Sequence, residues 1–293
     1  MNIKKIKILG SGPTGSLLAL TIASEKCKVV LVDPLTDVEL SSRDKGYAIT
    51  QSSRKIFEEF KLWDELNKFT YGFDSLSIVD SEIAQSVIIR TNDLKKTNKT
   101  QTNIGWVIEH KYLMKILIDY VNGNKNIERL YYDSTENEDF DFILAADGRD
   151  SSSRSNWKIK YLKRIYNQRC ISFRAILKEL PHSRAYEIFR HEGPLALLPL
   201  GDNIYQVIWF SENSNTQLKL KLSKEELLKS LEKLLPDNIK PLEIVSEIST
   251  YSVAQAFTLP KLNLFKNILV GDAAHSFHPV GGQGLNSCIR DVY

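Results

Sequence analysis

A chain of 293 residues that is 42% hydrophobic and 26% charged has the composition of an ordinary folded protein, and this excludes a disordered chain. Its net charge of +3 is too small to indicate a nucleic-acid partner. No apolar run reaches the roughly 20 residues that span a bilayer. The cysteines, Cys27, Cys170 and Cys288, are odd in number and far apart, which favours a reducing cytoplasmic compartment over a disulfide framework.

The chain begins with a strand–turn–helix pattern. A short apolar strand is predicted over Ile6–Leu9 and a helix up to Ser24, and between them stands the turn Gly10-Ser11-Gly12-Pro13-Thr14-Gly15. In this G-x-G-x-x-G spacing the first glycine makes the turn, the second admits a pyrophosphate and the third packs the helix on the strand. The pattern predicts a dinucleotide, FAD or NAD, without choosing between them.

The second strand carries the acid that such a turn requires. Lys28–Val32 is a predicted strand that ends at Asp33, 18 positions after Gly15, close to the spacing of a ribose-binding carboxylate. An Asp beside Pro34 could also simply start a turn. With the glycine turn ahead of it, we predict that Asp33 binds ribose.

The next segments are read as helix, strands and helix. Apolar residues recur at helical spacing over Ser52–Asn67, which predicts one helix with its stripe in the core. Three strands, Leu76–Val79, Val87–Arg90 and Ile104–Ile108, are predicted as an insertion in a substrate-side sheet. A helix then follows over Glu109–Asn122, with His110 as a helix-start residue.

A second strand-end motif follows the predicted strands Ile127–Tyr132 and Phe140–Ala146. The sequence Ala146-Asp147-Gly148-Arg149-Asp150-Ser151 places a carboxylate at a strand end and a glycine that tolerates unusual backbone angles. An Asp-Gly turn has many structural uses, but the apolar strand before it favours a ligand contact. Arg154 is either a phosphate contact or an exposed residue at a helix start.

An antiparallel sheet and a helix are predicted next. The sheet is predicted from strands that Gly and Pro residues separate, and Trp209 and Phe210 are assigned to its core. Ser223 and Glu226 form a capping-box pattern at the start of a helix over Ser223–Leu235. The sheet strands are Ile171–Lys178, Tyr186–Arg190, Leu195–Leu200 and Tyr205–Phe210.

The stretch Asn267–Asn286 holds the third motif. The apolar run Ile268–Val270 predicts a strand, and Gly271 and Asp272 place a carboxylate at its end, where open α/β sheets bind ligands. A proline- and glycine-rich loop then leads to a helix near Leu285, whose free N–H groups favour an electron-rich ligand. The candidate contacts of this loop and helix are Pro279, Gly282, Gln283, Gly284, Leu285 and Asn286.

The spacing Asp272, His275 and His278 is also one that could suggest a metal site. Pro279 and the glycines prevent a single regular helix across it, and no fourth ligand is indicated. We therefore expect no metal, and no side chain can be named as a catalytic base.

Three fingerprints, GSGPTG, ADGRDSSSR and GDAAHSFHPVGGQGLN, stand in this order in the chain. Together they resemble the class A flavoprotein monooxygenases of the p-hydroxybenzoate hydroxylase type, particularly the hydroxylases of ubiquinone biosynthesis. The resemblance implies an α/β fold: a Rossmann-like FAD-binding domain over 1–74, 109–156 and 251–293, and an interleaved antiparallel-sheet substrate domain over 75–108 and 157–250. It also implies that the family's C-terminal helices are absent, which leaves the activity of the shortened chain open.

The resemblance also implies the chemistry. FAD is reduced by NAD(P)H, reacts with O2, and hydroxylates an aromatic ring, a phenol or polyprenyl-phenol quinone precursor. Asp272 is expected on the ribityl chain and the amides of Gly284–Asn286 at the pyrimidine end of the flavin. The family usually carries an arginine where this chain has Lys45, which is expected to contact flavin or phosphate or to be a solvated loop lysine.

Other readings stay open on the same fold. A flavin reductase, epoxidase or halogenase, or a catalytically silent FAD-binding protein, would carry the same fingerprints. The partner is expected to be a small aromatic molecule and no nucleic acid, and peripheral membrane contact stays open.

Overall fold

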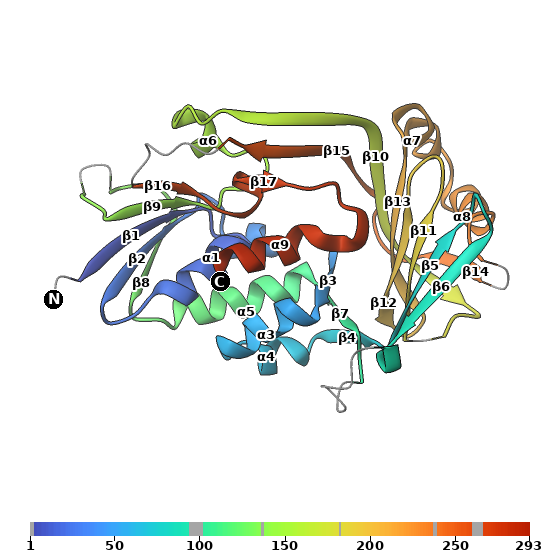
Figure 1. Ribbon diagram of the computed structural model, residues 1–293, viewed down its shortest axis with the longest axis horizontal. Helices are drawn as coiled ribbons and strands as arrows, with labels where there is room; N and C mark the ends of the chain where they lie inside the picture. Colours follow the sequence, from blue (N-terminus) through green and yellow to red (C-terminus); the bar gives the residue numbers. More distant parts are fainter. Residues whose placement is uncertain (1–2, 94–101, 136–137, 182, 237–238, 260–265) are drawn as a thin grey trace.

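The computed structural model describes residues 3–93, 102–135, 138–181, 183–236, 239–259 and 266–293. Two sheets stand at opposite ends of the molecule, and a group of helices fills the space beside the first (Figure 1). Among the described helices, none is both long and apolar enough to cross a membrane.

The first sheet has five strands, all parallel, in the order β16-β9-β1-β2-β8. Its strands are short and mostly apolar because helices and loops cover them, as in other parallel sheets. They end at the same edge, so the residues that follow β1, β9 and β16 meet there. The strands are β1 (Lys4–Leu9), β2 (Cys27–Val32), β8 (Ile127–Leu130), β9 (Phe142–Ala145) and β16 (Asn267–Leu269).

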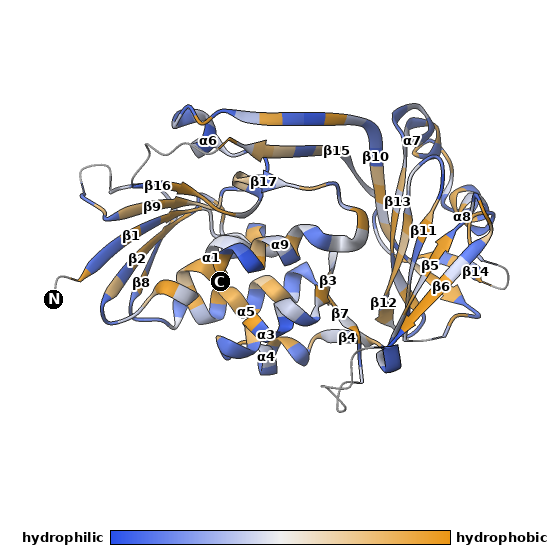
Figure 2. Cartoon of the chain, viewed as in Figure 1, coloured by the Kyte–Doolittle hydropathy of each residue, from blue (hydrophilic) through white to orange (hydrophobic). Residues whose placement is uncertain are grey.

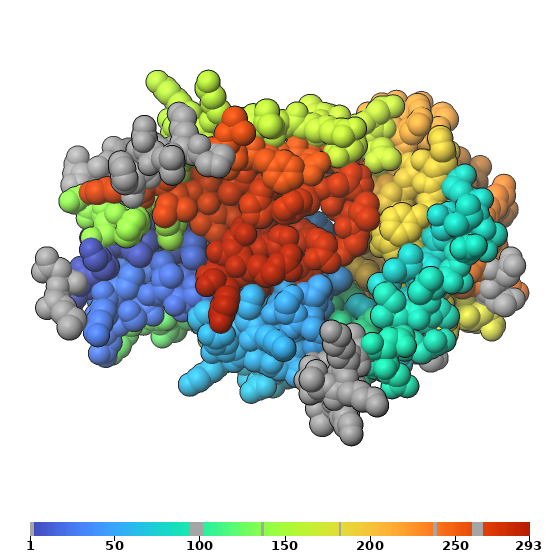
Figure 3. Space-filling model, viewed as in Figure 1, coloured from blue at the N-terminus to red at the C-terminus, as the bar shows by residue number. Residues whose placement is uncertain are grey.

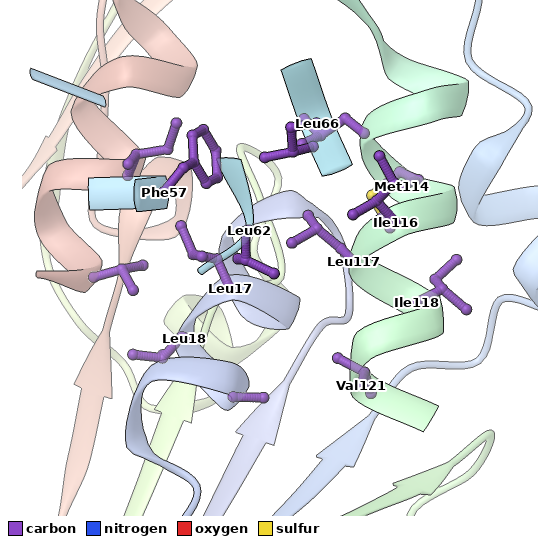
Figure 4. Packing of buried hydrophobic residues seen from close by; sticks show 14 of the residues in the cluster. Leu17, Leu18, Phe57, Leu62, Leu66, Met114, Ile116, Leu117, Ile118 and Val121 are labelled. Carbon is purple, nitrogen blue, oxygen red and sulfur yellow. The ribbon is translucent and has the colours of Figure 1, made fainter. Parts of the chain in front are cut away.

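Three helices cover one face of this sheet: α1 (Pro13–Ile22), α5 (His110–Asn122) and α9 (Gln283–Val292). Leu17 and Leu18 of α1 and Leu117 and Val121 of α5 belong to one buried apolar cluster, and all four residues are at most 6% exposed (Figure 4). Apolar residues also concentrate on α1 and α5 where they face each other and the sheet (Figure 2). This core fixes the position of α1, whose first turn belongs to the site.

A break divides the helix predicted over Ser52–Asn67, so that prediction was wrong in its middle. The structure has α3 (Gln51–Glu59) and α4 (Trp63–Asn67) with Lys61 at φ +58° between them. A left-handed residue ends a helix, and the turn it makes buries Leu62. The apolar stripe is core, as predicted.

The second sheet has nine strands in the order β17-β15-β10-β13-β12-β11-β5-β6, with β14 paired to β10. All of its pairings are antiparallel except that of β5 with β11. The strands are β5 (Ser75–Asp80), β6 (Gln85–Arg90), β10 (Tyr161–Lys178), β11 (Arg184–Phe189), β12 (Leu195–Gly201), β13 (Ile204–Glu212), β14 (Lys240–Ile244), β15 (Ser249–Thr258) and β17 (His275–Ser276).

The structure extends the sequence prediction for this sheet. β10 begins ten residues earlier than Ile171, because it first pairs with β15 alone and only from Gln168 with β13. The helix α7 (Asn213–Lys219) and the strands β14, β15 and β17 were not among the predicted elements. The helix α8 (Lys224–Glu232) confirms the capping box, since Ser223 and Glu226 bond to each other's backbone N–H.

A third sheet links the two larger ones. β3 (Gly46–Thr50) and β4 (Thr70–Phe73) both pair with β7 (Gly105–Glu109). The prediction that residues 104–108 join the substrate-side sheet was therefore wrong. β7 pairs with β3 and β4 of the third sheet and leads directly into α5. The remaining elements are α2 (Asp37–Ser41), α6 (Ser152–Asn156) and the 3-10 turns η1 (Thr91–Asp93), η3 (Gly271–Ala273) and η4 (Val280–Gly282).

The two chain segments assigned to the substrate domain, 75–108 and 157–250, supply β5, β6 and β10 to β14 of the nine-stranded sheet. Its first two strands, β17 and most of β15, come from residues after 250. The chain thus crosses between the sheets several times, and the exact domain boundaries stay a prediction.

Candidate functional site

A cavity of about 480 Å³ lies where the edge of the five-stranded sheet faces the nine-stranded sheet. We call it the flavin cavity. Figure 3 shows a small opening in this region, bordered by the red C-terminal segment. Of the residues predicted to bind the cofactor, those that line it are Pro13, Thr14, Lys45, Asp147, Asp272, Pro279, Gly282, Gly284 and Leu285.

The first glycine turn has the shape that a dinucleotide requires. Gly10 has φ +97°, and a Cβ on Gly15 would lie 1.8 Å from the carbonyl oxygen of Gly10. By contrast, a Cβ on Gly12 would meet nothing within 4 Å. Gly10 and Gly15 therefore hold the turn together, while Gly12 leaves open space at the start of α1, where its free N–H groups suit a pyrophosphate.

Asp33 supports this turn from behind. It is 9% exposed and does not line the cavity. One carboxylate oxygen accepts from the backbone N–H of Ser11 at 2.7 Å and the other from Leu35 at 2.9 Å. A carboxylate has about four acceptor positions, so capacity for a ribose hydroxyl remains, and ribose binding stays a prediction.

Asp147 supplies an unsatisfied acceptor. Its Oδ2 accepts from the backbone N–H of Ser153 at 2.9 Å, whereas its Oδ1 is buried without a partner among the described residues. Because Asp147 lines the cavity, a ligand hydroxyl or N–H would satisfy it. A buried acceptor at the end of β9 suits a ligand that carries hydroxyl groups.

Arg154 fulfils neither of its two predicted roles, because it is 4% exposed and bonded to backbone. Its Nη1 donates to the carbonyl of Ala273 at 3.0 Å and its Nη2 to that of Arg149 at 2.8 Å. It thereby ties the loop after β9 to the loop after β16. The second fingerprint contains the arginine that holds it against the third.

The third fingerprint is fixed by an acid that the sequence reasoning missed. Asp291 of α9 accepts from the backbone N–H of Gly271 at 3.1 Å and pairs with His275 Nε2 at 2.6 Å. Gly271 has φ +63°, and its own Cβ would come within 2.9 Å of Thr14, so no larger residue fits. These contacts hold Asp272 at the cavity wall.

The two histidines of this loop do not gather with Asp272 into a cluster. His275 is paired with Asp291, while the His278 ring lies 5.0 Å from that of Tyr166 and 5.6 Å from that of Phe210. No group of three or more metal-type side chains occurs in the part of the chain that the structure describes.

Asn286 is fully occupied by the protein. Its side chain is 0% exposed, accepts from Thr50 N at 3.0 Å and Ser53 Oγ at 2.7 Å, and donates to Ala48 O and Gly282 O. It therefore joins the start of α9 to β3 and α3. Only the backbone of this helix start is left to face a flavin, and there Gly284 opens onto free space.

The remaining predicted contact of this loop, Gln283, donates its side chain to the carbonyl of Gly281 at 3.1 Å and is exposed. The structure thus does not bring it into the cavity. Gly10, Gly12, Gly15 and Gly271 also lie outside the lining and shape the backbone around it, and Asn286 lies outside it and holds that backbone with its side chain.

Lys45 is half-buried in the cavity wall between two aromatic rings. Its Nζ lies 5.3 Å from the ring centre of Tyr47 and 5.4 Å from that of Tyr251. Burial lowers the pKa of Lys45, and the carboxylate of Asp272 opposes that shift. The alternative of a solvated loop lysine does not describe this position.

The cavity wall also contains residues that no sequence motif identifies. Tyr47 bonds to His110 Nδ1 at 3.0 Å, and burial raises the pKa of Tyr47 to about 12, so it is a neutral phenol. Tyr251 stands within β15 without any motif around it. Arg149 was within the second fingerprint, and its Nη1 donates to Ser252 O at 3.2 Å.

Glu187 was missed as well. It lies on β11 on the face of the sheet that carries Ile208 of the cavity wall, since Glu187 is in register with Ala196 and Ala196 with Ile208. Burial raises the pKa of Glu187 to about 7, and a hydrogen bond from the backbone N–H of Gly281 opposes part of this rise. Sequence alternation alone could have placed it on this face, but not beside the loop of η4.

Comparison with known proteins agrees with this site. Residues 122–293 match the family described as FAD binding domain. The chain is 24% identical to the 3-demethoxyubiquinol 3-hydroxylase of Escherichia coli over 98% of its own length and 77% of the relative's. It is 23% identical to the ubiquinone hydroxylase UbiL of Rhodospirillum rubrum over 99% and 71% of the two chains.

The fold is also shared with a solved structure. The p-nitrophenol 4-monooxygenase PnpA of Pseudomonas putida superposes with a TM-score of 0.77 at 18% identity, covering 100% of this chain and 78% of PnpA. The prediction of FAD, which the first fingerprint alone could not separate from NAD, is confirmed. Because the family match spans more than half of its residues, the chain belongs to the family described as FAD binding domain.

Proposed function

We propose that this protein uses NAD(P)H and O2 to hydroxylate an aromatic ring, that of a phenol or a polyprenyl-phenol precursor of a quinone. The relatives that are named as ubiquinone hydroxylases favour this substrate class. FAD, when bound, supplies the redox and oxygen chemistry. The protein supplies binding, orientation and exclusion of water.

One observation carries the proposal: the flavin cavity has two unlike walls. On one side stand backbone turns and carboxylates, Asp147 and Asp272 among them. On the other stand apolar side chains of the nine-stranded sheet, Leu198, Ile208 and Val253. A polar dinucleotide fits against the first wall, and a flat apolar substrate between its ring and the second.

The residues divide the work accordingly. The start of α1 at Pro13 would hold the pyrophosphate, and the start of α9 would offer backbone N–H groups to the pyrimidine end of the flavin. Asp147 Oδ1 and Asp272 would accept from ribityl hydroxyls. Lys45 places a positive charge in the same wall, where it favours an electron-rich flavin ring.

The test is product formation by the purified chain. FAD-loaded protein is given NADH or NADPH, a phenol or short-chain polyprenyl-phenol, and ¹⁸O2. The proposal expects nicotinamide oxidation that rises with substrate and a product heavier by one ¹⁸O atom. Nicotinamide oxidation that yields only hydrogen peroxide, with no labelled product from any candidate, would contradict it. A halogenated, epoxidised or reduced product would favour the alternative enzymes on this fold.

We infer further that the protein works in the cytoplasm against an anionic membrane surface, where a polyprenyl substrate would reside. Residues 151–178 and 248–271 contain no acidic residue, and they include both strands of the β10–β15 ribbon. Leu162, in register with Phe257, is 64% exposed and Phe257 37%. Lys160 and Arg164 flank Leu162 at two positions on either side, so the ribbon's outer face combines apolar and cationic groups.

Vesicle sedimentation tests this contact. The full chain should pellet with vesicles that contain phosphatidylserine and stay in solution with phosphatidylcholine alone. Leu162→Asp should reduce the pelleted fraction severalfold. Val87→Asp is the matched control, since Val87 is 63% exposed but lies on β6, far from the ribbon. Equal pelleting with both lipids, or an equal loss in both variants, would refute the contact.

A further inference from the structure

A second hollow, of about 370 Å³, lies on the other face of the nine-stranded sheet. We call it the outer groove. Consecutive residues of β13 separate the two spaces, because Ile208 lines the flavin cavity and Trp209 lines the outer groove. The helix α8 lies over this face, on the side of the sheet that points away from the FAD-binding half (Figure 1). Nothing in the proposed hydroxylation uses this groove.

Two cations stand at the floor of the outer groove beside one aromatic ring. Lys219 Nζ lies 5.1 Å from the ring centre of Trp209, and the guanidinium carbon of Arg190 lies 6.0 Å from it. The side chain of Lys219 is only 15% exposed, and burial lowers its pKa. A further cation, Lys233, stands at the rim. Burying two cations together is unfavourable unless acceptors surround them.

The two carboxylates of the outer groove, Glu82 and Glu192, already contact protein groups. Glu192 lies 3.5 Å from Lys219 and also accepts from Asn215 Nδ2 at 3.0 Å. Glu82 accepts from the backbone N–H of His191 at 3.1 Å. Two carboxylates thus line the groove together with three cations, Arg190, Lys219 and Lys233, so the groove keeps an excess of positive charge.

Two buried donors in the outer groove have no acceptor. Trp209 is 1% exposed, and its Nε1 lacks a hydrogen-bond partner among the described residues. The same holds for Nε of Arg190, although another nitrogen of that side chain donates to Phe210 O at 3.0 Å. A buried N–H left without an acceptor costs about 1–3 kcal/mol. An acceptor that enters the groove would remove this cost.

We propose that the outer groove binds a small anion, a carboxylate or a phosphate, whose oxygens accept from Trp209, Arg190 and Lys219. Charge-assisted bonds of this kind are the strong ones, and the indole beside them provides an apolar surface for the rest of the ligand. The ligand is separate from the substrate and from FAD, since the sheet stands between the two spaces.

Calorimetric titration of the FAD-loaded full chain tests the proposal. Sodium phosphate and sodium benzoate are the probes, each at ionic strength held constant with sodium chloride, and one saturable site is expected. Saturation by phosphate alone would assign the site to a phosphate-bearing ligand, and by benzoate alone to an organic carboxylate. No saturable binding of either anion would overturn the proposal.

Two variants locate the site. Trp209→Phe keeps an aromatic ring but removes the N–H, and Lys219→Met keeps the length but removes the charge. Each should weaken binding about tenfold, the effect of one lost hydrogen bond to a charged group. Lys163→Met, at an exposed position of β10, should bind as the wild type does.

Flavin absorbance and thermal melting show whether each variant is folded. If Trp209→Phe is unstable, Lys219→Met decides alone, because that residue lies near the end of a surface helix. Wild-type affinity in Lys219→Met would place the anion elsewhere, in the flavin cavity, and would refute the outer groove as its site.

Discussion

The two walls of the flavin cavity are built by different means. The FAD-binding wall depends on backbone shape: Gly10, Gly15 and Gly271 sit where a Cβ would collide with neighbouring atoms. The substrate-side wall depends on side chains that alternate across a sheet, such as Leu198 and Ile208. The first wall therefore tolerates no larger residue at these three glycines without a shift of the backbone, whereas the second can change its residues and keep its fold.

The largest expected effect is a difference in the free energy of unfolding between alanine substitutions at two glycines of one turn. In Gly15→Ala the new Cβ would lie 1.8 Å from Gly10 O, so the turn and α1 must separate. We expect a loss of about 4 kcal/mol or more in the free energy of unfolding, even without FAD. Denaturant unfolding of the apoprotein measures it.

Gly12→Ala is the matched control, because its Cβ would meet nothing within 4 Å. The apoprotein should be as stable as the wild type, while FAD retention after desalting should fall as the methyl group enters the pyrophosphate space. Equal unfolding energies for the two variants would contradict the division into a closed and an open glycine.

Asp272→Ala should act on the ligand and not on the fold. Asp272 lines the cavity and its described side-chain contact is with Cys288 Sγ at 3.7 Å, a weak bond. Loss of its bonds to ribityl hydroxyls should weaken FAD binding tenfold to about a hundredfold. Fluorescence titration of the apoprotein with FAD measures the affinity, and Asp139→Ala, at a 93% exposed side chain, is the control. Unchanged affinity in Asp272→Ala would remove this residue from the cofactor site.

The pH dependence of stability at Glu187 tests the substrate-side wall. Its folded pKa of about 7 lies above the ordinary value of 4.5, so the folded state holds the proton more tightly than the unfolded state. The resulting stability is complete below pH 4.5 and is lost as the pH rises through 7. Glu187→Gln cannot ionise and should be more stable than the wild type at pH 8, by about 2 kcal/mol after allowance for partial solvation.

Thermal melting of both proteins from pH 4.5 to 8 checks this prediction. The difference between Glu187→Gln and wild type should be small at the acid end and grow towards pH 8. Glu179→Gln, on the exposed turn after β10, should show no such trend. A difference that does not change with pH would mean that Glu187 ionises as an exposed glutamate does.

The same contrast explains what the sequence could and could not predict. Motifs made of glycine and an acid after an apolar strand are local, so the sequence predicts the turns at Gly10, Asp147 and Asp272 close to the ends of β1, β9 and β16, where the structure has them. Residues that join distant segments leave no local pattern. Asp291 reaches back to Gly271, Arg154 reaches Ala273, and Tyr251 meets Lys45 only after the sheet has formed.

The predictions of one continuous helix over residues 52–67 and of the partners of β7 failed for a related reason. The periodicity of residues 52–67 is helical throughout, and only the left-handed conformation of Lys61 ends α3. β7 has a strand sequence, but its pairing with β3 and β4 joins segments that lie far apart in the chain, which no local pattern identifies. In both cases tertiary contacts overrode a correct local pattern.

Lys45 offers the smallest and most discriminating test, since it lies where the walls meet. An arginine there would keep the positive charge between Tyr47 and Tyr251 and would stay ionised at any pH used in the laboratory. Because burial lowers the pKa of Lys45, wild-type FAD affinity should begin to fall at a lower alkaline pH than an ordinary lysine would give. Lys45→Arg should change FAD affinity only severalfold at pH 7 and abolish that alkaline decline, whereas Lys163→Arg should leave the decline in place. FAD titrations of the wild type and both variants across the alkaline pH range measure this decline in affinity. A decline that persists in Lys45→Arg would show that the charge of Lys45 does not face the flavin.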